Sequence, residues 1–295
     1  MGDLDLGFLA QLVVNGVVTG GVYVLVAIGL TLIFGVLGIV NFAHGELYML
    51  GGYFGLVAAT VLKLDFFSAL CLAMAGVAIL GVIAERVVFR PLRRRDPTDT
   101  IITSFGLAVI LQNAALLIFG AQPQMIRTGL SRIPVSVWKV SLTMQRAIIP
   151  VTALVLVLIL HCILRYTWTG RSLRAAAQNS VVASLVGVDI NKVAAATFAT
   201  GAALAAGAGV LMGSVFMMQP STGSMIALKA FTVVILGGMG SVYGAVGAGF
   251  LLGIVESLTA GYVANELKDV VAFLIVILVL LFRPQGLFGT ALVKV

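Results

Sequence analysis

Charged residues are scarce in this sequence, at 10% of 295 residues, whereas soluble domains carry roughly 25%. Hydrophobic residues make up 61%, which is more than one water-soluble core of this size can bury. This composition excludes a soluble enzyme, a disordered chain and a small disulfide-linked scaffold. We predict an all-α, polytopic helical membrane protein in which residues 1–295 form a single transmembrane domain.

Cysteine and catalytic motifs are scarce as well. Cys71 and Cys162 both lie in apolar runs, so we expect free thiols within the core and no disulfide. The sequence has no Walker-type phosphate-binding motif, no His-Glu-x-x-His motif and no Cys/His cluster. We therefore expect no catalytic residue, no metal site and no cofactor in this chain. The net charge of +7 indicates basic cytoplasmic loops and not a nucleic-acid partner.

Stretches without charge mark the expected membrane segments. A spanning helix needs about 20 residues, and the charge-free stretches of roughly that length or more are 6–45, 66–84, 100–126, 147–164, 193–228 and 230–255. Residues 47–62 and 270–282 form shorter apolar stretches, which span if their flanking charges lie at the interface. We expect eight to ten membrane segments in the bilayer.

Basic residues predict the orientation of these segments. Two clusters belong on the cytoplasmic side, because basic residues concentrate there; they comprise Arg86, Arg90, Arg93, Arg94 and Arg95, and Arg165, Arg171, Arg174 and Lys192. Residues 122–146 then lie outside. Residues 134–142 alternate partly between apolar and polar side chains, which predicts a small β-rich cap there. Lys229 and Glu256 are expected near the outer surface, as a snorkelling side chain and a solvated cap.

Glycines interrupt two of the apolar stretches. One break covers residues 35–41, ahead of a helix that we expect to start near Phe42, and the other lies between residues 237 and 241. Glycine weakens a helix and permits positive φ angles. A broken apolar segment in each half of the chain is typical of transporters with discontinuous helices. The residues of the second break that we assign to a pathway are Gly237, Gly238, Gly240 and Ser241.

The first break carries polar side chains at Asn41, His44 and Glu46. Ionisable groups at membrane depth are costly, which favours a substrate site or pathway at this point. The alternative is a helix start, with Asn41 as N-cap and Glu46 in the first turn near the positive end of the helix dipole. Two ligating groups are too few for a structural metal site.

The second basic cluster contains a candidate docking helix. Ser180 is a suitable N-cap for a short helix over residues 181–186, Gly187 is a suitable end, and Asp189 is suited to cap the following helix. This short helix presents an apolar face next to two amides, a shape suited to a groove on another protein. The alternative is an ordinary interfacial turn. The candidate docking residues are Arg174, Gln178, Asn179, Val181, Val182, Leu185 and Gly187.

Four motifs in order carry a family resemblance over about residues 8–289: Asn-Phe-Ala-His-Gly-Glu at 41–46, Arg-Ala-Ala-Ala-Gln-Asn at 174–179 with Gly-Val-Asp at 187–189, Gly-Gly-Met-Gly-Ser at 237–241 with Gly-Ala at 244–245, and Arg-Pro-Gln-Gly-Leu-Phe at 283–288. The chain resembles the membrane permease subunit of a branched-chain (hydrophobic) amino acid ABC importer, the shorter of the two permeases that these systems usually pair.

The resemblance implies a bacterial inner-membrane protein that pairs with a second permease. Two ATPase subunits would bind ATP on its cytoplasmic side, and an extracytoplasmic binding protein would deliver substrate. Residues 175–187 match the family's ATPase-coupling segment, although Ala175 or Ala176 stands where other ABC importers place an acidic residue. The family also contains permeases for urea and short amides, so the substrate stays open.

Two other classes of function remain open from the residues alone. A secondary transporter driven by protons or sodium needs carboxylates within the membrane, and Glu46 and Glu256 are the candidates. A passive channel is disfavoured, since the sequence shows no charged ring or selectivity-filter motif.

Overall fold

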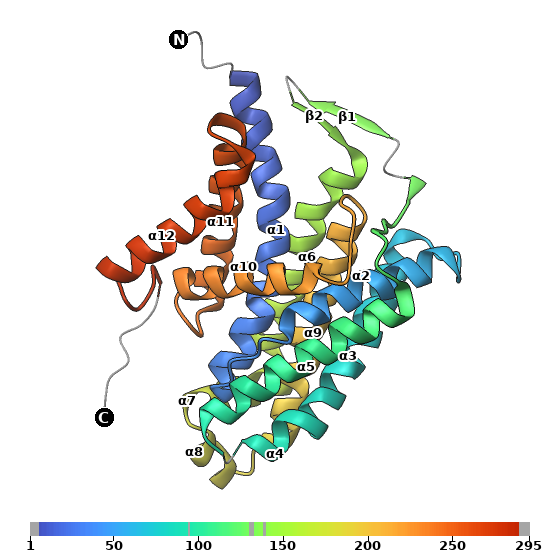
Figure 1. Cartoon of the computed structure of the whole chain (residues 1–295). Helices are drawn as coiled ribbons and strands as arrows, with labels where there is room; N and C mark the ends of the chain where they lie inside the picture. The colour runs from blue at the N-terminus through green and yellow to red at the C-terminus, as the bar shows by residue number, and fades with distance from the viewer. Residues whose placement is uncertain (1–5, 94, 130–132, 138–139, 289–295) are drawn as a thin grey trace.

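The computed structural model describes residues 6–93, 95–129, 133–137 and 140–288 (Figure 1). Its helices and strands, in chain order, are α1 (Leu6–Leu37), α2 (His44–Thr60), α3 (Phe66–Ala84), a π-helical turn (Glu85–Phe89), α4 (Arg90–Leu92), α5 (Pro97–Phe119), β1 (Pro134–Val137), β2 (Val140–Thr143), α6 (Met144–Tyr166), α7 (Trp168–Gln178), α8 (Ser180–Leu185), α9 (Ile190–Gly213), α10 (Thr222–Gly237), α11 (Val242–Tyr262), a 3-10 turn (Asn265–Leu267) and α12 (Lys268–Phe282).

Six of the described helical segments are long and apolar enough to cross a membrane: Leu6–Leu37, Phe66–Leu92, Pro97–Phe119, Met144–Tyr166, Ile190–Gly213 and Val242–Tyr262. The helices α2, α10 and α12 are shorter, at 17, 16 and 15 residues. The predicted all-α, polytopic membrane architecture is confirmed. The expected total of eight to ten membrane segments includes these shorter helices and stays a prediction.

Helix α1 runs through the middle of the molecule, with α11 alongside it (Figure 1). Its residues from Gly20 to Ile33 are all buried. Glycines allow the two helices to pack closely, because a Cβ added to Gly16 would lie 2.6 Å from Ile254 Cα, and one added to Gly20 would lie 3.0 Å from Phe250 Cα. Gly249 and Gly253 supply the matching small residues on α11. Such four-residue spacing of glycines is a common way for membrane helices to approach each other.

The two basic clusters lie at the same end of the molecule, beside α4, α7 and α8 (Figure 1). Arg93 of the first cluster forms an ion pair with Glu85 and donates a hydrogen bond of 3.1 Å to Asn191, the residue before Lys192 of the second cluster. This placement agrees with the orientation inferred from charge, in which both clusters face the cytoplasm.

The opposite end carries the predicted β-rich cap. Strands β1 and β2 pair antiparallel, with Pro134 opposite Thr143, while residues 138 and 139 between them fall outside the described ranges. The Ser141 N–H donates to Gln11 of α1 at 2.9 Å, so the start of α1 lies beside the cap. A short bridge between Gln124 and Met218 ties the loop after α5 to the loop after α9.

The prediction that Cys71 and Cys162 lie in the core was wrong. Both thiols are free, as expected, but both side chains are exposed on the surface of the chain. An apolar run in a membrane protein has lipid on one side and protein on the other. Apolar neighbours in the sequence therefore do not indicate burial within the protein.

The contact between α1 and α11 generates a stability prediction. The Gly16→Ala variant should unfold at a lower temperature in detergent, because the new methyl group meets the α11 backbone and overpacking costs about 1–3 kcal/mol. The control is Gly106→Ala in α5, where an added Cβ meets nothing within 4 Å. That change should leave the melting temperature unchanged or raise it, since alanine is the better helix former. Equal melting temperatures for the two variants would contradict this account.

Candidate functional site

The two predicted helix breaks are present and lie against each other. Helix α1 ends at Leu37 and is followed by Gly38 with a φ of 68°, while α10 ends at Gly237 and is followed by Gly238 and Gly240 with φ angles of 98° and 87°. These positive angles are open to glycine at no steric cost. A Cβ added to Gly35 would lie 3.2 Å from Gly240 Cα, so the backbones touch where the two breaks meet.

The C-terminal motif packs onto the same place. The N–H of Leu287 donates to the Leu236 carbonyl at 2.8 Å, and the N–H of Phe288 donates to the Gly237 carbonyl at 3.2 Å. These carbonyls belong to the last turn of α10, and the carbonyl groups of a last turn have no hydrogen-bond partners within the helix. Ser241 then starts α11, where its hydroxyl accepts from the Gly244 N–H at 3.1 Å. Residues of two motifs and of the first break therefore meet in one break cluster: Gly35, Gly237, Gly238, Gly240, Ser241, Leu287 and Phe288.

Asn41 is buried at the start of α2 and serves the backbone. Its side-chain oxygen accepts from the Ala43 N–H at 3.0 Å, and the helix itself begins at His44 with Ala43 as the N-cap. The prediction that Asn41 is the N-cap was therefore wrong by two residues, because its side chain instead holds the turn ahead of the helix. Asn41 is buried within the protein, at 1% exposure.

His44 and Glu46 are buried as well, at 1% and 2% exposure. The His44 ring packs against α1, 2.8 Å from where a Cβ on Gly29 would stand, so the glycine leaves room for the imidazole. The Glu46 carboxylate lies against Gly223 in the first turn of α10, where the unpaired N–H groups of a helix favour a negative charge. The three polar residues of the first break are thus placed together in the core, each at a helix start or crossing.

The candidate docking helix forms as α8, with its apolar face outward. Val181, Val182 and Leu185 are 68%, 54% and 81% exposed, whereas Ala183 is buried. The N-cap is Asn179, whose side-chain oxygen accepts from Val181 N–H and Val182 N–H at 3.0 Å each. The expectation that Ser180 would be the cap was wrong by one residue, because the helix starts at Ser180 and the Asn179 side-chain oxygen accepts from both N–H groups.

The remaining docking residues take supporting positions. Gly187 follows α8 with a φ of 89°, which confirms its role as the helix end. Asp189 caps α9 by accepting from Asn191 N–H at 2.9 Å, as predicted. Gln178 is exposed at the end of α7. Arg174 turns back and donates to the Leu164 carbonyl at the end of α6, so it joins two helices near the cytoplasmic end.

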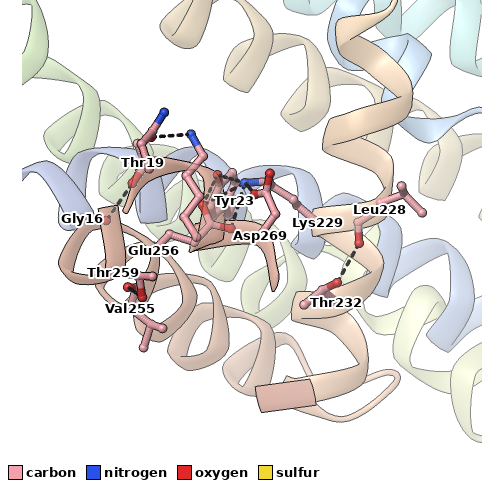
Figure 2. Close-up of polar contacts among 12 residues, drawn as sticks. Gly16, Thr19, Tyr23, Leu228, Lys229, Thr232, Val255, Glu256, Thr259 and Asp269 are labelled. Atoms are coloured by element: carbon pink, nitrogen blue, oxygen red, sulfur yellow. Dashed lines mark hydrogen bonds and ion pairs between the residues drawn. The ribbon is translucent and has the colours of Figure 1, made fainter. Parts of the chain in front are cut away.

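An ion-pair cluster lies within the helix bundle, at residues that the sequence analysis placed elsewhere (Figure 2). Lys229 of α10 contacts Glu256 of α11 at 2.8 Å and Asp269 of α12 at 2.8 Å. Tyr23 of α1 donates to Glu256 at 2.7 Å. The side chains of Lys229 and Glu256 are 13% and 7% exposed, and burying charge to this degree is tolerated only when the charges are paired.

The expectation that Lys229 snorkels to the surface and that Glu256 is a solvated cap was therefore wrong. Both side chains are largely buried and are paired within the protein. A signal for this pairing was available in the sequence: Lys229 is the single charge between the apolar stretches 193–228 and 230–255, and Glu256 directly follows the second stretch. A lone charge in an apolar stretch requires a partner within the protein.

Comparisons with known proteins agree with this architecture. Residues 12–280 match the family described as "Branched-chain amino acid transport system / permease component". The chain is 38% identical to the high-affinity branched-chain amino acid transport system permease protein LivH of Escherichia coli (strain K12), over 98% of both chains. It is 38% identical to BraD of Pseudomonas aeruginosa over 96% of both chains, and 30% identical to a probable LivH of Methanocaldococcus jannaschii over 97% of this chain and 94% of that protein.

These relatives and the six apolar helices make the chain a multi-pass transport protein of the bacterial inner membrane. The match covers both helix breaks, the docking helix and the ion-pair cluster. The chain therefore belongs to the family of permease components of branched-chain amino acid transport systems.

Proposed function

We propose that this chain is one of two permease subunits of an ABC importer and forms part of the pathway for leucine, isoleucine and valine. An extracytoplasmic binding protein delivers the amino acid, and two ATPase subunits on the cytoplasmic side bind and hydrolyse ATP. The names of the relatives and their coverage of nearly the whole chain support the substrate class. The permease itself performs no chemical step.

The exposed apolar face of α8 is the observation that carries this proposal. Three large aliphatic side chains on a six-residue helix are exposed at the basic end of the molecule. An exposed apolar patch on a rigid, doubly capped helix is typical of a protein interface. A cytoplasmic ATPase with an apolar groove is the partner that an importer requires at this end.

The packing behind α8 supplies a route for coupling. Leu173 and Ala176 of α7 are buried against Val193 of α9, and Val36 at the end of α1 packs on the same group. Displacement of α8 by an ATPase would therefore act on α1 and α9 together. Since Gly35 lies beside Gly240, the break cluster would respond to the same displacement. ATP and substrate shift the balance between the conformations of the transporter only if they bind those conformations with different affinities.

The pathway role of the two breaks is part of the proposal. Asn41, His44 and Glu46 hold the start of α2, and the break between α10 and α11 holds the ends of two further helices. We infer that the pathway opens toward the cytoplasm when these helix ends move apart. Helix ends held by a few hydrogen bonds separate at lower cost than continuous helices, which would have to break internal bonds.

An ion-coupled secondary transporter is less well supported. Such a protein needs an intramembrane carboxylate that exchanges its ion during transport. Glu256 is instead paired with Lys229 and accepts from Tyr23. Uptake that persists in ATP-depleted vesicles under a proton or sodium gradient would contradict the importer proposal.

The composition of the complex is the direct test of the proposal. The tagged chain is extracted gently from native membranes, and the proteins recovered with it are identified by mass spectrometry. We expect a second permease and an ATPase in stoichiometric amounts. The co-encoded binding protein is then tested against leucine, valine, isoleucine, urea and short amides. Recovery of the chain alone would contradict the proposal.

The docking helix gives a second prediction. Leu185→Asp should abolish recovery of the ATPase and reduce leucine uptake at least about tenfold, because a charge in the buried centre of an interface costs several kcal/mol. The matched control is Ser180→Asp, which places the same charge in the first turn of α8, on the face opposite the exposed aliphatic side chains. The control should keep both ATPase recovery and uptake. Normal recovery with Leu185→Asp would remove α8 from the interface.

Asn41 gives a third prediction. Asn41→Leu removes the acceptor for the Ala43 N–H and should lower stability by about 0.5–2 kcal/mol, the usual cost of losing a capping interaction. If Asn41 also serves the pathway, leucine uptake per assembled complex should fall as well. Asn41→Ser, which keeps a short acceptor, is the control. Unchanged uptake per assembled complex with Asn41→Leu would leave Asn41 a capping residue only.

A further inference from the structure

A cleft of about 350 Å³ lies beside the ion-pair cluster. Helices α1, α2, α9, α10, α11 and α12 line it, together with the loop that follows α9. Pockets for small ligands run from about 300 to 1,000 Å³, so this cleft has the capacity for one small molecule. No residue that the sequence analysis assigned to a pathway lines it.

One wall of the cleft is charged. Lys229, Glu256 and Asp269 all line it, and the cluster contains two carboxylates for one buried ammonium group. The Asp269 side chain is the most accessible of the three, at 34% exposure. Lys268 lines the cleft as well, so the lining carries two carboxylates and two ammonium groups, a balance that suits a ligand with one charge of each sign. Figure 2 shows the three side chains converging with Tyr23.

Much of the remaining lining of the cleft is apolar and adaptable. Met212, Met217 and Met225 line the cleft with Ile226. Methionine side chains are unbranched and flexible, so they adapt to aliphatic groups of different shape. Leucine, isoleucine and valine differ in the shape of their aliphatic side chains.

A buried hydroxyl group without a partner also points to a ligand. Tyr48 of α2 lines the cleft and is 1% exposed, yet its hydroxyl group forms no hydrogen bond with the described residues. A buried polar group left unpaired is costly, and a polar ligand in the cleft would satisfy it. Tyr48 lies one helical turn after His44, on the helix that starts at the first break.

The cleft is on the side of the molecule that faces the binding protein. It is lined by Met217 and Met218 in the loop after α9, and Met218 is bridged to Gln124 near the β-rich cap. This is the end opposite the two basic clusters, which face the cytoplasm. A substrate released from an extracytoplasmic protein would meet this cleft before the break cluster.

We propose that this cleft is the first substrate site of the permease and that it recognises an α-amino acid. The carboxylates of Asp269 and Glu256 receive the α-ammonium group, and the methionines receive the aliphatic side chain. Lys268, which lines the cleft and bonds Asn265 at 3.2 Å, and the Tyr48 hydroxyl face the substrate carboxylate. The proposal rests on the proposed function. It excludes urea and short amides as substrates, since neither carries an ammonium group.

Thiol protection in the assembled transporter tests the site. Cys71→Ser and Cys162→Ser remove the exposed native thiols, and Met217→Cys places a thiol at the cleft, where the native side chain is 70% exposed. A membrane-impermeant methanethiosulfonate reagent should label it, and leucine should slow the labelling whereas urea should not. A thiol that the reagent does not reach, or that leucine fails to protect, would overturn the proposal.

The charge requirement is tested in the same background. Asp269→Asn should raise the leucine concentration for half-protection at least about tenfold, the effect of losing one charge-assisted hydrogen bond. The control is Asp65→Asn at the N-cap of α3, outside the cleft, where the new amide still accepts from the Ser68 N–H. An unchanged half-protection concentration with Asp269→Asn would overturn the role of the carboxylates.

The two proposals fail in different ways. If the intact transporter takes up leucine but leucine does not protect the thiol, the cleft is not the site and the proposed function stands. If the intact transporter with its own binding protein takes up urea or an amide and not leucine, the proposed function fails together with the amino-acid site. If leucine protects the thiol and this protection is weakened in the Asp269→Asn variant, both proposals are supported.

Discussion

The burial of α1 between α9 and α11 is the packing constraint on which the rest of the structure depends. Glycines on α1 and α11 bring the two backbones together, and the same helix then presents a different residue at each depth. Tyr23 reaches the ion-pair cluster, Gly29 makes room for His44, and Gly35 touches Gly240. A larger residue at any of these glycines would push apart the elements that meet there. One helix thereby links the ion-pair cluster to the two helix breaks.

The ion-pair cluster shows that charged side chains in an apolar environment are paired with each other. Lys229 holds α10 to both α11 and α12 through two carboxylates. Water would compete for these contacts at a surface, but in the bundle the charges have only one another. The cluster therefore joins three helices and forms one side of a cleft. In the proposed substrate site, the charges that pair the helices would also recognise the ligand.

The two ends of the molecule differ in how they are held. At the outer end, the β hairpin, the start of α1 and the loop after α9 are tied by hydrogen bonds between loops. At the end with the basic clusters, α7 rests on α1 and α9 through aliphatic contacts, and α8 leaves its own aliphatic face uncovered. Arg174 and Arg93 add hydrogen bonds to Leu164 and Asn191 at this end.

The amino-acid sequence alone predicted the all-α membrane fold, both helix breaks, the short helix α8 and the family, because hydropathy, glycine and capping residues act over a few neighbouring positions. Only the tertiary structure decided that Gly35 meets Gly240, that Lys229 pairs with Glu256, and that Cys71 is exposed. Lipid and protein core are equally apolar, so hydropathy does not distinguish a residue that faces a neighbouring helix from one that faces the bilayer. Contacts between distant helices depend on how whole faces fit together, and the charged cleft exists only once six helices and a loop have packed around it.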